Sequence, residues 1–215
     1  SIKLLNKNRR KIIKVDRWQP VCIEELIVIS APAYERYVPQ GIDIVEPAPY
    51  ENVFSRQSLQ LLRIALMRGV KVNSGSKKQR IYLNRSVNNA NLRGLDNSKE
   101  VIEVLQRHSI LSISPQQMSF EEQFVMCSNA ELIIAPIGAA LANMIFAPTG
   151  CNIIILSPYY EGASYNYYTR LAGVLGHKVT YILGSQVGAN VQPMHRSYHV
   201  DVATLDSVLS KLSFS

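Results

Sequence analysis

The sequence predicts an α/β fold in which a parallel β-sheet carries helices on both faces. From residue 80 onward, short runs rich in β-branched residues alternate with stretches whose apolar residues recur at helical spacing. That alternation is typical of parallel sheets. Two of the runs, Leu132–Ala135 and Ile153–Leu156, are apolar at every position, as strands covered on both faces are. The 215 residues, 47% hydrophobic and 18% charged, suffice for one such domain with an appendage and exclude a disordered or collagen-like chain.

The expected strands are short apolar segments, and most of the expected helices lie between them. Strands are predicted at 11–15, 26–30, 80–83, 110–113, 132–136, 152–157 and 179–183, and helices at 58–67, 98–108, 120–128, 139–146, 165–175 and 205–212. Ser119 with Glu122 forms a capping-box pattern, and Asn97 with Glu100 forms a weaker one. Gly69 and Gly176 each follow a helical pattern and are interpreted as stop signals.

The first part of the chain differs in composition from the rest. Residues 1–50 hold five prolines and are interpreted as a basic start and an extended segment that end an N-terminal domain; residues 51–215 are interpreted as the main domain. The net charge is +7, but residues 1–14 hold six basic residues and no acid, which leaves 17 basic and 16 acidic residues elsewhere. This basic arm is interpreted as a solvated terminus, with a missing domain, an anionic membrane surface or nucleic acid as alternatives. Nucleic acid is not expected, because the arm lacks interleaved aromatic residues.

Several classes of protein are excluded by what the sequence lacks. It has no run of about 18 apolar residues that would span a membrane. Its three cysteines, Cys22, Cys127 and Cys151, fit neither a disulfide framework nor a metal site and favour a reducing compartment. A cytoplasmic location is therefore expected, with a peripheral position at the inner membrane through the basic arm as an alternative. His195 and His199 have the spacing of a metal pair but no third ligand nearby, so no metal site is expected.

The candidate ligand-binding residues are those that follow the predicted strands, because ligands of open parallel sheets bind beyond the carboxyl ends of the strands. Asn84 and Arg85 follow one strand, and the turn Pro136–Ala140, of sequence PIGAA, follows another. Small residues and free amides at a helix start suit a phosphate group, although close packing of helix on sheet explains the same glycine equally well. Arg85 is either a partner for a diphosphate or a surface arginine. The motifs GxGxxG and GxxxxGK[ST] are absent.

A series of motifs resembles the family 61 glycosyltransferases, which include capsular-polysaccharide-type bacterial proteins. The motifs are RIYLNR at 80–85, RGLDN at 93–97, SFEEQ at 119–123, Ala130, and PIGAALAN at 136–143 followed by Phe146, Pro148 and Gly150. The resemblance runs from about residue 21 to residue 183.

The resemblance implies the Rossmann-like, donor-binding C-terminal half of a two-domain GT-B glycosyltransferase. Such enzymes are inverting, need no metal or other cofactor, and transfer a sugar from a nucleotide-sugar donor to a glycan or other hydroxyl acceptor, here in polysaccharide biosynthesis. The catalytic base that activates the acceptor is not identifiable. The implied donor-binding residues are Asn84, Arg85, Arg93, Gln123, Pro136, Ile137, Gly138, Ala139 and Asn143.

Two positions depart from the family pattern. Ile137 stands where the family has a histidine in the turn, and Ile155 stands where it has a glutamate late in the following strand. Isoleucine neither donates to a phosphate nor accepts from a hydroxyl, and both positions are expected at strand ends that face the site. The sequence therefore predicts slow sugar transfer or none, and a non-catalytic nucleotide- or partner-binding domain of the same fold is the alternative.

Overall fold

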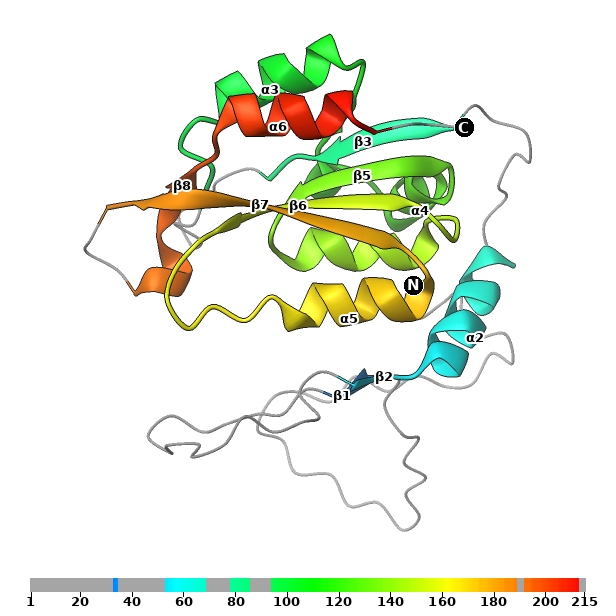
Figure 1. Ribbon diagram of the computed structural model, residues 1–215. Helices are drawn as coiled ribbons and strands as arrows, with labels where there is room; N and C mark the ends of the chain where they lie inside the picture. The colour runs from blue at the N-terminus through cyan, green and yellow to red at the C-terminus, as the bar shows by residue number, and fades with distance from the viewer. Residues whose placement is uncertain (1–32, 35–52, 69–77, 86–93, 189–191, 213–215) are drawn as a thin grey trace, which may run out of the picture. The chain divides into compact units, whose positions relative to one another are not determined.

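The computed structural model describes residues 33–34, 53–68, 78–85, 94–188 and 192–212 (Figure 1). The chain divides into two compact units, residues 1–71 and residues 72–215. The basic arm at residues 1–14, the strands predicted at 11–15 and 26–30, and the stop signal at Gly69 lie outside the described residues. The domain boundary at residue 50 stays a prediction.

The first unit contains a short strand pair and a helix. Strand β1 (Ala33–Tyr34) pairs antiparallel with β2 (Val53–Phe54). Helix α2 (Arg56–Met67) follows, and it confirms the helix predicted at 58–67. Ser55 caps it, because its side-chain oxygen accepts a hydrogen bond of 3.2 Å from the Ser58 N–H.

The second unit is built on a six-stranded sheet with the strand order β4-β3-β5-β6-β7-β8. Its first five strands are parallel, which confirms the predicted α/β class. The last strand, β8, pairs antiparallel with β7, so the sheet is mixed rather than wholly parallel. The strands are β3 (Gln79–Leu83), β4 (Leu111–Ile113), β5 (Ala130–Pro136), β6 (Asn152–Pro158), β7 (Lys178–Val187) and β8 (Ser197–His199).

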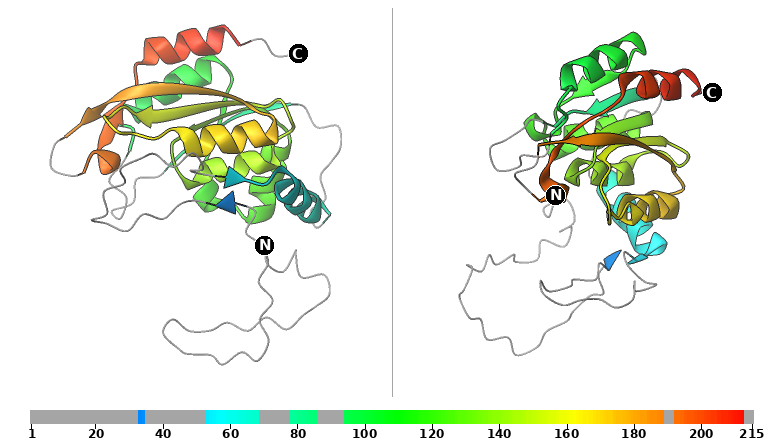
Figure 2. Two further views of the ribbon diagram at one scale, coloured as in Figure 1. Left: turned by 60° about the horizontal axis from the view of Figure 1, so that its bottom comes forward. Right: turned by 60° about the vertical axis from the view of Figure 1, so that its left-hand side comes forward.

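Helices cover both faces of this sheet, as the sequence predicts. Helices α3 (Ser98–Arg107) and α6 (Val202–Ser210) pack together on one face, and α4 (Phe120–Ser128), the 3₁₀ helix η2 (Ala139–Phe146) and α5 (Asn166–Leu175) lie on the other (Figures 1 and 2). The short 3₁₀ turns η1 (Pro115–Gln117) and η3 (Pro193–His195) complete the unit.

Apolar side chains of the buried strands point alternately to the two faces of the sheet and form a core on each. Leu132 and Ile134 of β5 join Ile154 and Leu156 of β6 in the cluster beneath α3 and α6. Because successive strand residues point to opposite faces, the intervening residues of these strands face the other layer. In that layer the Phe124 ring of α4 packs against the Phe146 ring of η2, with centroids 4.9 Å apart. Two buried faces explain why these strands are continuously apolar.

The predicted helix signals have mixed outcomes. The capping box at Ser119 and Glu122 is formed, with both hydrogen bonds present. Gly176 ends α5 in the left-handed conformation, with φ of +77°. The α-helix expected at 139–146 is instead a 3₁₀ helix, whose three-residue turn places the buried Leu141 and Met144 on one side.

Asn97 begins α3 without capping it. Its carboxamide instead bonds the backbone of Val200, accepting from the N–H at 3.1 Å and donating to the carbonyl at 2.8 Å. Asn97 thus ties the start of α3 to the segment between β8 and α6.

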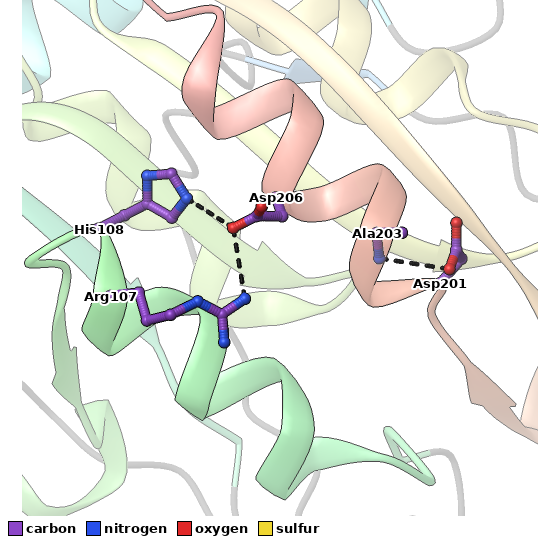
Figure 3. Close-up of polar contacts among 5 residues, drawn as sticks. All are labelled: Arg107, His108, Asp201, Ala203 and Asp206. Atoms are coloured by element: carbon purple, nitrogen blue, oxygen red, sulfur yellow. Dashed lines mark hydrogen bonds and ion pairs between the residues drawn. The ribbon is translucent and has the colours of Figure 1, made fainter.

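Polar contacts also join α3 to α6 (Figure 3). Oδ1 of Asp206 lies 2.9 Å from Nε2 of His108 and 3.4 Å from Nη2 of Arg107. Asp201 caps α6 by accepting hydrogen bonds from the N–H groups of Ala203 and Thr204, at 3.3 and 3.1 Å. The C-terminal helix is therefore fixed at its first turn and again on its side.

The connections around β3 define a switch point in the sheet. From β3 the chain passes through α3 to β4 on one side, then through α4 to β5 on the other side of β3. These two crossovers use opposite faces, so the loops after β3 and β5 diverge and leave a crevice. Ligands of open α/β sheets bind at such a place, beyond the carboxyl ends of the strands.

Candidate functional site

A pocket of about 470 Å³ lies at this switch point. Residues from the ends of β3 and β5, from the turn after β4, from α4 and from η2 form its wall. They are Leu83, Arg85, Pro115, Gln116, Gln123, Pro136, Gly138, Ala139, Ala140 and Asn143.

Arg85 supplies the positive charge of the pocket. It follows β3 by two residues and is half-buried. Its Nη1 lies 3.5 Å from the carbonyl oxygen of Ile137, a long hydrogen bond. Within the described part of the chain, no carboxylate forms an ion pair with Arg85. The guanidinium therefore keeps most of its five donors for a ligand.

The turn after β5 brings backbone amides to the same pocket. Gly138 precedes η2, and its carbonyl accepts from the Tyr168 hydroxyl at 2.7 Å and from the Leu141 N–H at 3.0 Å. The latter is the first hydrogen bond of η2, so the N–H groups of Ala139 and Ala140 have no acceptor within the helix. Such N–H groups attract anions.

Two carboxamides form the neighbouring wall. Gln123 of α4 donates from Nε2 to the carbonyls of Pro115 and Met118, at 2.8 and 3.2 Å. Its Oε1 accepts a hydrogen bond of 3.0 Å from Nδ2 of Asn143. Gln123 thus anchors the turn after β4 to η2, and both side chains line the pocket.

Six of the nine residues that the sequence places at the donor site line this pocket: Arg85, Gln123, Pro136, Gly138, Ala139 and Asn143. Asn84 and Ile137 adjoin the pocket without lining it. Their N–H groups pair with the backbone, of Ile113 at 2.7 Å and of Leu156 at 2.8 Å. Arg93 lies outside the described residues. The binding role of all nine residues stays a prediction.

The sequence reasoning missed Leu83, Pro115 and Gln116. Pro115 and Gln116 follow β4 after one intervening residue, Ser114, so the carboxyl-end rule would have found them if it had been applied to that strand as well. Ala140, which also lines the pocket, belongs to the turn Pro136–Ala140 that the sequence singled out, although it was not among the implied donor-binding residues.

The expectation that Ile155 faces the site is wrong. Ile155 is fully buried and is followed by three further residues of β6. It pairs in register with Ala135 of β5 and Tyr181 of β7, so it lies in the middle of the sheet and packs in the core.

Two other kinds of site are absent from the part of the chain that the structure describes. No three His, Cys, Asp or Glu side chains there gather to hold a metal ion. Burial raises the pKa of the Cys127 and Cys151 thiols to about 12, so both are protonated at neutral pH and poor nucleophiles. No helix among the described residues is long and apolar enough to cross a membrane.

The comparison with protein families identifies the chain. The family model described as Glycosyltransferase 61 matches residues 12–154, which include every residue that lines the pocket. The chain belongs to the glycosyltransferase 61 family, and its fold is consistent with the Rossmann-like half of a glycosyltransferase. The family makes it a transferase that uses a donor and an acceptor. No curated protein matches the chain.

Proposed function

We propose that the pocket binds the diphosphate of a nucleotide-sugar donor and that the chain is the donor-binding half of an inverting, metal-independent GT-B glycosyltransferase. The acceptor is a hydroxyl of a glycan or similar molecule in polysaccharide biosynthesis. The protein acts in the cytoplasm, with a peripheral position at the inner membrane as the alternative. The observation that carries the proposal is that Arg85 lines one pocket at the switch point of the sheet together with Ala139 and Ala140, the first two residues of η2.

The chemistry follows from the charge that develops on the leaving group. When the bond between sugar and phosphate breaks, a nucleoside diphosphate departs with added negative charge. Arg85 and the orphan amides are donors held in place before the reaction, which is the arrangement that stabilises such charge most effectively. Tyr168 holds the turn that carries these amides, because its hydroxyl donates to the Gly138 carbonyl.

A second candidate is a non-catalytic domain of the same fold that binds a nucleotide or a protein partner. It is favoured by Ile137, because the family pattern has a histidine there and isoleucine has no donor to offer the leaving group.

Binding and turnover separate these candidates. We expect thermal stabilisation of the full chain by nucleoside diphosphates and their sugars, since a ligand at 100 times its dissociation constant adds about 2.7 kcal/mol. Arg85→Ala should reduce that stabilisation to about half or less, because it weakens binding by about 1.5–3 kcal/mol. The charge-matched control is Arg107→Ala, which removes an exposed arginine from α3. Absence of nucleotide binding at millimolar concentration by folded protein would contradict the enzyme and the nucleotide-binding domain, and would leave the partner-binding domain.

Assays of donor hydrolysis and sugar transfer then decide between enzyme and binding domain. Turnover of ordinary size, about 1 per second or more, with any nucleotide sugar establishes the enzyme. Binding without turnover across the panel supports the non-catalytic domain.

A further inference from the structure

An oriented chain of hydrogen bonds fixes which end of the Asn143 carboxamide is bound to protein. Nε2 of Gln123 donates to two backbone carbonyls, those of Pro115 and Met118. A carboxamide nitrogen has two hydrogens, so both are used. The opposite atom, Oε1 of Gln123, is therefore an acceptor, and Nδ2 of Asn143 donates to it at 3.0 Å.

The reversed arrangement is strongly disfavoured. Turning the Gln123 carboxamide over would set its Oε1 against two carbonyl oxygens, and turning Asn143 over would set Oδ1 against Oε1. Each contact would join two acceptors with no hydrogen between them. The backbone carbonyls of Pro115 and Met118 thus fix the orientation of the Gln123 carboxamide, and Gln123 in turn fixes the orientation of Asn143.

The consequence concerns the other end of Asn143. Asn143 lines the pocket, and within the described residues no donor hydrogen-bonds its Oδ1. The pocket therefore has two chemically different walls. Arg85 and the amides of η2 are donors for an anion, whereas Oδ1 of Asn143 is an acceptor.

We propose that Oδ1 of Asn143 accepts a hydrogen bond from a hydroxyl group of the nucleotide sugar and thereby selects and orients the donor. This inference rests on the proposed function. Phosphate oxygens that carry no proton are acceptors only and do not pair with Oδ1, so the diphosphate lies on the Arg85 side and a hydroxyl-bearing sugar lies toward Asn143. The hydroxyl belongs either to the ribose or to the transferred sugar.

The experiment compares ligands with and without hydroxyls by calorimetry on the full chain. The ligands are inorganic pyrophosphate, uridine and guanosine diphosphate, their 2′-deoxy and 3′-deoxy analogues, and the uridine diphosphate glucose and guanosine diphosphate mannose sugars. For Asn143→Ala we expect unchanged affinity for pyrophosphate and about 3- to 10-fold weaker binding of the best hydroxyl-bearing ligand, the range of one neutral hydrogen bond. Arg85→Ala should instead weaken pyrophosphate and nucleotide alike.

The comparison between these ligands identifies the hydroxyl that Asn143 binds. If Asn143→Ala binds the nucleoside diphosphate less tightly than wild type does, but binds one deoxy analogue equally well, the hydroxyl belongs to the ribose. If Asn143→Ala loses affinity only for the nucleotide sugars, the hydroxyl belongs to the transferred sugar. Asn129→Ala is the matched control, because its carboxamide caps a backbone carbonyl at the end of α4, outside the pocket wall.

A second variant tests the orientation itself. Gln123→Leu removes the acceptor that holds the Asn143 nitrogen and frees Asn143 to turn that nitrogen toward the pocket. The hydroxyl-bearing ligands that bind less tightly to Asn143→Ala should therefore also bind less tightly to Gln123→Leu, although Asn143 is intact. Equal loss for pyrophosphate in Asn143→Ala would reduce Asn143 to a structural role, and no loss for any ligand would overturn the inference while leaving the proposed function in place. If the wild-type chain binds neither pyrophosphate nor nucleotide, the proposed function fails first.

Discussion

A side-chain carbon at position 138 would lie 3.3 Å from Nη1 of Arg85. That distance is shorter than side chains ordinarily adopt, so the guanidinium can rest against the turn after β5 because residue 138 is glycine. The sequence suggested two roles for this glycine, close approach of a ligand or packing of helix on sheet. The structure adds a third role, which is to admit the arginine of the neighbouring strand.

The first prediction tests this pairing. Gly138→Ala should displace the Arg85 guanidinium and weaken nucleotide binding, with little change in stability because the nearest atoms belong to the end of a flexible side chain. Arg85→Ala should cost about 1.5–3 kcal/mol of binding free energy, and Arg85→Lys should restore only part of it because the planar fork is lost. Calorimetry with nucleoside diphosphates measures all three variants.

The double variant decides whether the glycine acts through the arginine. If it does, Gly138→Ala should have almost no further effect in the Arg85→Ala background, since the two changes then remove the same interaction. Additive losses would mean that the glycine serves the ligand directly.

The second prediction concerns the carboxamide of Asn97, which holds both backbone groups of the fully buried Val200. Asn97→Ala would leave a buried N–H and a buried carbonyl without these partners. We expect the free energy of unfolding to fall by about 1–3 kcal/mol, the cost of buried unsatisfied groups. Denaturant unfolding checks this, with the exposed Asn166→Ala at the start of α5 as control. Equal stability of both variants would contradict it.

The third prediction is a pH dependence at the contact between α3 and α6 (Figure 3). The hydrogen bond with His108 holds the pKa of Asp206 below its ordinary value. A carboxyl whose pKa is lower in the folded state stabilises the fold above its unfolded pKa of about 3.9. That contribution is lost as the pH falls through the lower, folded pKa.

Asp206→Asn should therefore be less stable than wild type near pH 7, and the difference should shrink once the pH is below about 4. High salt should also reduce the difference, because the Asp206 side chain is partly exposed, at 43%. Thermal melts across pH measure the effect. The control is Glu103→Gln, an exposed carboxylate of α3 without a hydrogen bond or ion pair among the described residues. A difference that does not vary with pH would argue against the assignment.

The fourth prediction follows from the position of Ile155. Restoring the glutamate of the family pattern by Ile155→Glu would place a carboxyl in the core of the sheet, where nothing pairs with it. We expect a loss of about 3 kcal/mol or more in the free energy of unfolding, against about 0.5–1.5 kcal/mol for the control Ile155→Val. A stable Ile155→Glu protein that binds nucleotide more tightly would show that the side chain reaches the site after all.

The sequence alone determined the local structure and most of the pocket. Apolar runs and helical spacing located five of the six strands and every helix of the second unit except the 3₁₀ turns, because these patterns depend on neighbours along the chain. The rule that ligands lie beyond strand ends then selected Arg85 and the Gly138 turn, since it needs only the direction of parallel strands.

Only the tertiary structure decided which residues meet across the fold. Asn97 and Val200 are about a hundred positions apart. No local pattern indicates that the carboxamide of Asn97 will form hydrogen bonds with the backbone N–H and carbonyl of Val200. The pairing of β8, which is three residues long, likewise offers too few alternating positions to detect. Ile155 shows the same limit, because a continuously apolar strand does not reveal which of its residues lies at the edge and which in the core. The orientation of Asn143 depends on backbone carbonyls of another loop, and such long-range contacts are set by packing rather than by sequence pattern.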